Sequence, residues 1–200
     1  MKRMIFIAVI LVLIAAACKK EESYTQSATA TETTATSTSV TTTETTVTTT
    51  VAGTMLSDKD KDFVTDAGKG GKAEVELAQD AVSHASNADV KAFAQKLIDD
   101  HGKANQELAQ LASTKGVTIP SELQSKMKEA KERLMKLTGK SFDQAFIKQM
   151  VDDHTSTIKM FEDEAKVAAD SDVKSFIDKT LPTLREHLTR AKELQTKLGK

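Results

Sequence analysis

The chain has 200 residues, and its 28 basic and 29 acidic side chains leave a formal net charge of −1. Charges this evenly balanced do not provide the basic surface that nucleic-acid binding requires, so we expect no nucleic-acid partner. A single cysteine cannot form a disulfide within the chain. The length allows one domain with additional segments, and the composition shows where each of them lies.

Residues 1–17 have the features of a secretion signal. Lys2 and Arg3 precede an apolar run at residues 5–17, which is too short to span a bilayer comfortably. The run ends in three alanines and Cys18, a pattern that resembles the processing site of bacterial lipoproteins, although Ala15 stands where leucine is usual. In such a lipoprotein the thiol of Cys18 carries the lipid. The alternative is an ordinary cleaved signal with an incidental cysteine.

A lipid on Cys18 would hold the exported protein at a membrane of the cell envelope. Lys19 resembles the sorting signal that directs enterobacterial lipoproteins outward, which favours the periplasmic face of the outer membrane over the inner membrane. Residues 18–56 would then form a tether, because half of residues 23–54 are threonine and large apolar side chains are almost absent. This composition buries too little surface to offset the entropy of ordering, so we predict disorder.

Residues 57–200 are predicted to form one all-α domain. Apolar side chains recur at alternating three- and four-residue steps, the spacing of long helices packed nearly parallel. The pattern predicts long helices near residues 64–85, 90–111, 147–168 and 173–198, and a short helix at 122–137. Capping boxes are predicted at Ser121 with Gln124 and at Ser141 with Gln144, and Gly139 is predicted to stop a helix.

The two halves of this domain repeat one another. The sequence DVKAF at residues 89–93 recurs as DVKSF at residues 172–176, and the same interval separates Phe63 from Phe146. A constant offset across two elements predicts a duplicated helical hairpin. Two hairpins joined by a crossover of roughly 25 residues predict a ferritin-like four-helix bundle made of two helical hairpins joined by a crossover helix.

Several motifs resemble a known family. They are Gly70-Gly71 followed by Glu74-Val75, Phe93-Ala94 followed by Asp100-His101, Ile119-Pro120, Asp153-His154, and Thr180-Leu181-Pro182 with His187. In their order and spacing they resemble the domain of unknown function 4142 over about residues 58–198. The resemblance implies a ferritin-like bundle in a secreted bacterial protein, and it implies no established activity.

Four polar side chains interrupt the apolar seams, one on each long predicted helix: Glu74, His101, His154 and His187. The first two lie about 20 Å along their helices from the first hairpin turn, and the other two lie about 25 Å from the second turn. Because these turns lie at opposite ends of a bundle about 42 Å long, the four side chains are expected to meet near mid-height. One glutamate and three histidines facing inward are a candidate site for Zn, Cu, Fe or Ni.

Three acids directly precede the seam histidines: Asp100, Asp153 and Glu186. Each is a candidate for orienting a neighbouring imidazole from outside the ligand set. Met150 lies one helical turn before His154, which makes copper a metal to test. The fourth histidine, His84, lies off the seam and is expected to be exposed.

The same four seam residues could instead form a buried polar network that fixes helix register without any metal. The Glu-x-x-His pairs of di-iron bundles are absent, and no nucleophile–base set is present, so we expect no enzyme. Two functions remain open. One is a lipid-anchored envelope protein whose non-catalytic bundle serves a binding, stress or structural role, with an envelope protein as a possible partner. The other is a metal-binding bundle with a Glu/His₃ site and weak redox activity.

Overall fold

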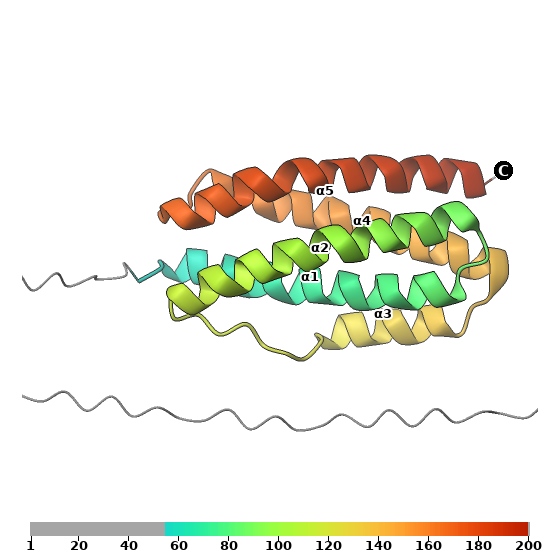
Figure 1. Ribbon diagram of the computed structural model, residues 1–200, viewed down its shortest axis with the longest axis horizontal. Coiled ribbons are helices and arrows are strands. Elements are labelled where there is room, and N and C mark those ends of the chain that lie inside the picture. Colours follow the sequence, from blue (N-terminus) through green and yellow to red (C-terminus); the bar gives the residue numbers. More distant parts are fainter. Residues whose placement is uncertain (1–54, 200) are drawn as a thin grey trace, which may run out of the picture. The chain divides into compact units, whose positions relative to one another are not determined.

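The computed structural model describes residues 55–199, which form five α-helices and no β-strand within that range (Figure 1). The helices are α1 (Asp58–His84), α2 (Ala88–Thr114), α3 (Ser125–Met135), α4 (Gly139–Ala165) and α5 (Ser171–Leu198). The predicted all-α class is confirmed. None of these helices combines the length and the apolar character needed to cross a bilayer. The signal peptide, Cys18 and nearly all of the threonine-rich tether lie outside the described residues and stay predictions.

The four long helices pack as two hairpins. α1 lies along α2, α4 lies along α5, and the hairpins meet through α1 with α4 and α2 with α5. Figure 1 shows that α2 and α4 begin at the same end of the bundle, so the chain must return along its length between them. This return carries the short helix α3, which packs against α1 and α4.

Side chains at the helix starts explain where three of the long helices begin. Ser57, Asn87 and Asp170 accept hydrogen bonds from backbone N–H groups in the first turns of α1, α2 and α5 respectively. These groups would otherwise lack partners within the helix. Asn87 and Asp170 are separated by the offset of the repeated sequence, so the duplication extends to the caps of α2 and α5.

The predicted capping boxes are wrong. α3 begins at Ser125 and α4 at Gly139, and neither start has a side-chain cap. Gly139 does not stop a helix: at a φ of 58° it is the first residue of α4. The positive φ lets the chain change direction between α3 and α4, which glycine tolerates without a steric penalty. Gln144, expected in a capping box with Ser141, instead donates to the carbonyl of Leu198 at 2.9 Å and joins α4 to the end of α5.

The core consists of two apolar clusters with a polar layer between them. One cluster lies toward the α1–α2 turn and includes Leu77, Phe93, Leu97, Phe146, Met150 and Leu194. The other lies toward the α4–α5 turn and includes Phe63, Val64, Leu108, Ile158, Phe161 and Leu184. The positions between the clusters on the four long helices are those of Glu74, His101, His154 and His187. We call these four residues the histidine layer.

Two buried aspartates join the hairpins at opposite ends. Asp143, near the start of α4, accepts hydrogen bonds from the backbone N–H groups of Ser86 and Asn87 at 2.9 and 3.0 Å, and from the hydroxyl of Ser86. Asp60, near the start of α1, accepts from the N–H groups of residues 169 and 170, both at 3.3 Å. Each hairpin therefore caps the turn of the other. The offset of the repeated sequence also separates these two turn-capping aspartates.

Two glycines of α1 make room for side chains from other elements. A Cβ atom on Gly68 would lie 2.7 Å from the side chain of Ile119 in the crossover. A Cβ atom on Gly71 would lie 2.2 Å from Oδ1 of Asn105 on α2. Both distances are shorter than carbon can approach another atom, so a larger residue at either position would displace the side chain of Ile119 or Asn105 from its present place.

Replacing Asp143 with alanine should lower the free energy of unfolding of the full-length chain by about 3 kcal/mol, because two backbone N–H groups of the α1–α2 turn lose their acceptor. Urea denaturation measures this change. Asp152→Ala is the matched control, since Asp152 lies on the same helix and its side chain forms a surface ion pair with Lys148. Its loss should cost less than about 1 kcal/mol. Equal effects of the two substitutions would contradict the role assigned to Asp143.

Candidate metal centre

The structure brings together all four seam residues, one from each long helix. Glu74 comes from α1, His101 from α2, His154 from α4 and His187 from α5, and each is at most 5% exposed. The three imidazole rings form a compact triangle, with centroids 5.2 to 5.5 Å apart. The histidine layer is therefore a single polar cluster between the two apolar clusters of the core.

Each imidazole uses its outer nitrogen on a fixed acceptor. Nδ1 of His154 donates to the carbonyl of Met150 at 2.9 Å. Nε2 of His187 donates to Oδ2 of Asp100 at 2.9 Å. Nδ1 of His101 lies 3.3 Å from Oε2 of Glu74, and the carboxylate favours the tautomer with the ring proton on this nitrogen. A carbonyl or carboxylate on one ring nitrogen fixes the tautomer and leaves the other nitrogen available as a ligand.

Burial keeps two of these rings neutral. It lowers the pKa of His154, although Glu74 acts in the opposite direction. It also lowers the pKa of His187 to about 4, against the effect of the hydrogen bond with Asp100. A neutral imidazole has one ring proton, and in these rings the outer contact already holds it. Their inner nitrogens therefore present lone pairs at neutral pH.

The three inner nitrogens converge. Nε2 of His154 lies 3.4 Å from Nε2 of His101 and 3.3 Å from Nδ1 of His187. All three histidines can offer one ligand atom within 4.8 Å of the others. Four-coordinate zinc binds imidazole nitrogens at about 2.0–2.1 Å, which separates two ligand atoms by about 3.3–3.4 Å. The two separations match this value, and both are long for a hydrogen bond between ring nitrogens.

Glu74 was expected among the ligands, but the structure places it behind two of the rings. Its carboxylate faces the outer nitrogens of His101 and His154 at 3.3 and 3.4 Å. The side chain is 2% exposed, and its Oε1 atom has no hydrogen-bond partner among the described residues. A buried carboxylate oxygen without a hydrogen-bond partner lowers the stability of the folded protein unless a positive charge lies nearby.

Asp100 is one of the three acids expected to orient an imidazole, and it does contact one. It accepts from Nε2 of His187, a ring on a different helix, and it also pairs with Lys96 at 2.8 Å. Burial alone would raise the pKa of Asp100, but the hydrogen bonds from Lys96 and His187 hold it below its ordinary value. Asp100 therefore stays ionised and keeps the proton of His187 on the outer nitrogen.

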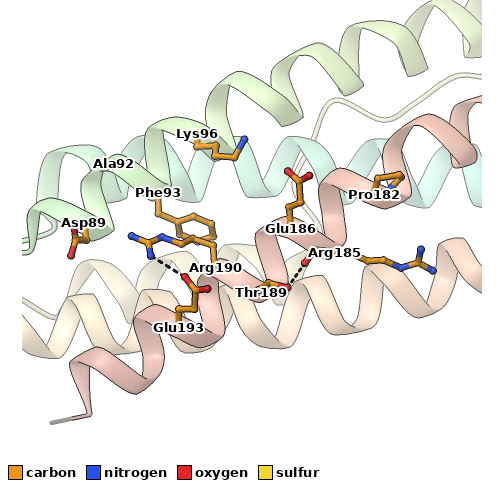
Figure 2. Close-up of a pocket in the computed structure, with 10 residues that line it drawn as sticks. All are labelled: Asp89, Ala92, Phe93, Lys96, Pro182, Arg185, Glu186, Thr189, Arg190 and Glu193. Carbon is orange, nitrogen blue, oxygen red and sulfur yellow. Dashed lines mark hydrogen bonds and ion pairs between the residues drawn. The ribbon is translucent and has the colours of Figure 1, made fainter.

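The other two acids do not contact a histidine ring. Asp153 accepts hydrogen bonds from Gln149 at 2.9 and 3.0 Å, and burial raises its pKa. Glu186 is exposed and lines a separate groove of about 750 Å³ between α2 and α5. Figure 2 shows it in this groove opposite Phe93 and Lys96. Its position before His187 in the sequence turns it away from the ring, because adjacent helix residues point in different directions.

Some parts of the site were not predicted from the sequence. The carbonyl of Met150 is one, because every residue carries a carbonyl and only the four-residue spacing to His154 hinted at the contact. Lys96 is another, and its four-residue spacing to Asp100 was the available signal. Nothing in the sequence indicated the cavity of about 160 Å³ that His101 and His187 line, because this cavity depends on how α2 and α5 pack. His84 is exposed, as expected.

Comparison with known proteins places the chain in a family. The model of the domain of unknown function DUF4142 matches residues 45–194. The chain belongs to this family. A crystal structure of a DUF305 fragment from Deinococcus radiodurans is similar to the DUF4142 domain with a TM-score of 0.63, covering 72% of this chain and 98% of that one. Their sequences are 12% identical, so the likeness concerns the fold alone. No curated protein matches the sequence.

The metal-free DUF4142 protein should lose stability on mild acidification. His187 has a folded-state pKa of about 4 against an ordinary value of 6.5, so below pH 6.5 the unfolded chain binds a proton that the folded chain does not. This residue alone should lower the free energy of unfolding by about 2 kcal/mol between pH 7 and pH 5. Denaturation of the full-length chain in the presence of a chelator measures the slope.

His187→Gln should reduce this pH dependence, because the variant lacks one of the two histidines whose pKa burial lowers. His84→Gln should leave the slope unchanged, since His84 is exposed in the folded protein. A wild-type chain equally stable at pH 7 and pH 5 would contradict the assignment of a neutral, buried His187.

Proposed function

We propose that this DUF4142 protein is a non-catalytic metal-binding module of the bacterial cell envelope. In this proposal a ferritin-like bundle holds one transition-metal ion between His101, His154 and His187. The observation that carries the proposal is the convergence of three imidazole nitrogens. In each of these rings the other nitrogen already faces a carbonyl or carboxylate oxygen. The arrangement presents three lone pairs to one point.

A network of hydrogen bonds explains this arrangement less well than a cation does. Nε2 of His154 faces two nitrogens, and a single added proton can lie on only one of the two contacts. That proton would create an imidazolium in a buried layer where burial lowers the pKa of both His154 and His187. A metal ion accepts all three lone pairs at once. It also supplies the positive charge that the unpartnered oxygen of Glu74 lacks.

The donor set favours a transition metal over calcium or magnesium. Neutral imidazole suits zinc, copper and iron, whereas hard cations prefer oxygen ligands. Glu74 and Asp100 would act from outside the ligand set by holding the rings of His101 and His187 in place. Outer partners of this kind raise the basicity of the ligands and fix their orientation.

The topology supports a site at this position. Two antiparallel hairpins joined by a crossover are the arrangement of ferritin-like proteins, in which metal sites are built in the bundle core from side chains on facing helices. The paired Glu-x-x-His motifs of di-iron centres are absent, because Leu97, Ile98, Met150 and Val151 stand at the relevant places before two of the histidines. We therefore propose one ion and no oxygen-activating chemistry.

The proposal places the module in the envelope through Cys18. The signal-like residues 1–17 and the small residues before the cysteine support export and lipidation. A threonine-rich tether at residues 18–56 would then hold the bundle away from the membrane surface, with the outer membrane favoured by Lys19.

The full-length chain purified without chelator should carry about one equivalent of a transition metal, measured by elemental analysis. His101→Ala and His154→Ala should abolish uptake, because each removes a nitrogen from the converging set. His84→Ala is the matched control and should keep the metal. Removing the metal should lower the melting temperature, since a ligand bound only by the folded state stabilises it by mass action.

The polar-network alternative makes a different prediction for the same measurements. If the histidine layer serves only to fix helix register, His101→Ala and His154→Ala should still destabilise the bundle through unpaired buried groups. Added Zn, Cu or Fe would then leave the melting temperature of the wild-type chain unchanged. A chain that is purified without metal and whose melting temperature does not change with any of the three ions would overturn the proposed metal site.

Expression in a bacterium that processes lipoproteins should give a membrane-bound product with acyl chains on Cys18, because the small residues before it fit the processing site. Mass spectrometry of the mature N-terminus detects the modification. Cys18→Ser should leave the precursor unprocessed or release the protein from the membrane fraction. An unmodified Cys18 in the mature protein would contradict the lipid anchor.

A further inference from the structure

The cavity beside the histidine layer opens between α2 and α5. Its lining includes two of the three proposed ligands, His101 and His187, together with Ala104 and Leu184. We call it the ligand-side cavity. Its volume of about 160 Å³ has room for roughly five water molecules at ~30 Å³ each. This is below the ~300 Å³ at which pockets for larger organic ligands begin.

The charges around the ligand-side cavity leave one cation uncompensated. Asp100 is already engaged by Lys96 and His187. Lys179 and Glu107 lie on the rim 4.0 Å apart and offset each other. Lys103 also lines the cavity, and no described carboxylate lies within ion-pair distance of it.

The cavity also offers hydroxyl groups. Thr180 and Thr183 line it from α5, and both are half-buried. Other threonines of this helix, such as Thr189 and Thr196, donate to the carbonyl four residues earlier. Among the described residues, Thr180 and Thr183 have no such hydrogen bond, so their hydroxyls remain available to a guest.

We infer that the metal ion keeps an open fourth position, and that a small anion of a few non-hydrogen atoms reaches it through the ligand-side cavity. The inference rests on the proposed metal site. Three imidazoles leave one position of a four-coordinate ion unfilled, the arrangement of zinc sites that bind an exchangeable ligand. Glu74 lies behind the rings, and no fourth protein donor joins the three histidines in the described part of the chain. The free Lys103 and the two hydroxyls suit an anionic oxygen or nitrogen ligand of the size of azide, carbonate or a short carboxylate.

The test uses the full-length chain in detergent, loaded with Co²⁺ as a spectroscopic substitute, and azide as the probe. Titration with azide should shift the visible absorption of the bound cobalt in a saturable manner. Lys103→Glu should weaken azide binding about fivefold at low salt and leave cobalt uptake unchanged, because it reverses a charge on the route to the metal. Lys91→Glu is the matched control, since Lys91 is exposed on the same helix and does not line the cavity.

The outcomes separate this inference from the metal site itself. If the chain takes up cobalt but its visible absorption does not change in a large excess of azide, the metal has no open position. This result overturns the inference alone. A chain that takes up neither cobalt nor zinc overturns the metal site and the inference together. Equal azide affinities of Lys103→Glu and Lys91→Glu overturn the route through the ligand-side cavity.

Discussion

The site depends on the hydrogen bonds with which each hairpin caps the turn of the other. Asp60 and Asp143 are both buried, and each accepts from two successive backbone N–H groups at the opposite turn. A shift of one helical turn between the hairpins would leave two carboxylates and four N–H groups unpaired, at a cost of several kcal/mol. Fixed register is what brings Glu74 and His101 from one hairpin level with His154 and His187 from the other.

That fixed register creates an electrostatic conflict within the core. Glu74 is a buried carboxylate with one unpartnered oxygen, and the nearby rings direct their lone pairs toward one another. Burying a carboxylate and three imidazoles whose polar atoms are not all paired is unfavourable, and replacing them by apolar residues would often stabilise a bundle. The apolar clusters on both sides of the layer supply the stability that allows it. A cation at the centre would remove the conflict, which is why we propose a metal ion rather than a structural network.

The sequence predicted well what depends on local periodicity, and poorly what depends on contacts across the bundle. The apolar steps identified four long helices, and the constant offset between the repeated segments identified two hairpins. The starts of the two uncapped helices, α3 and α4, were predicted wrongly. α4 begins at Gly139 through a positive φ, and no capping motif in the sequence signals such a start. Glu74 was predicted among the ligands and lies beside the histidines as expected, but it faces the outer nitrogens of two rings, because residue spacing gives the level of a side chain along the bundle and not its place within the layer. Asp60 and Asp143 share the offset of the repeat, a signal that was present in the sequence but carried no meaning until their partners were known.

The duplication is incomplete at the histidine layer. The same offset relates His154 to Gly71 and His187 to Ala104, so small residues stand at the positions that correspond to these two histidines. The space at Gly71 is occupied by the side chain of Asn105, which leaves no room for a ring there. His101 likewise corresponds to Leu184, a buried apolar residue. The turn-capping aspartates kept the symmetry because both hairpins need them to hold register. The histidine layer does not follow the repeat, so the described part of the chain carries the residues for one such proposed metal centre, with the ligand-side cavity on its α2–α5 side.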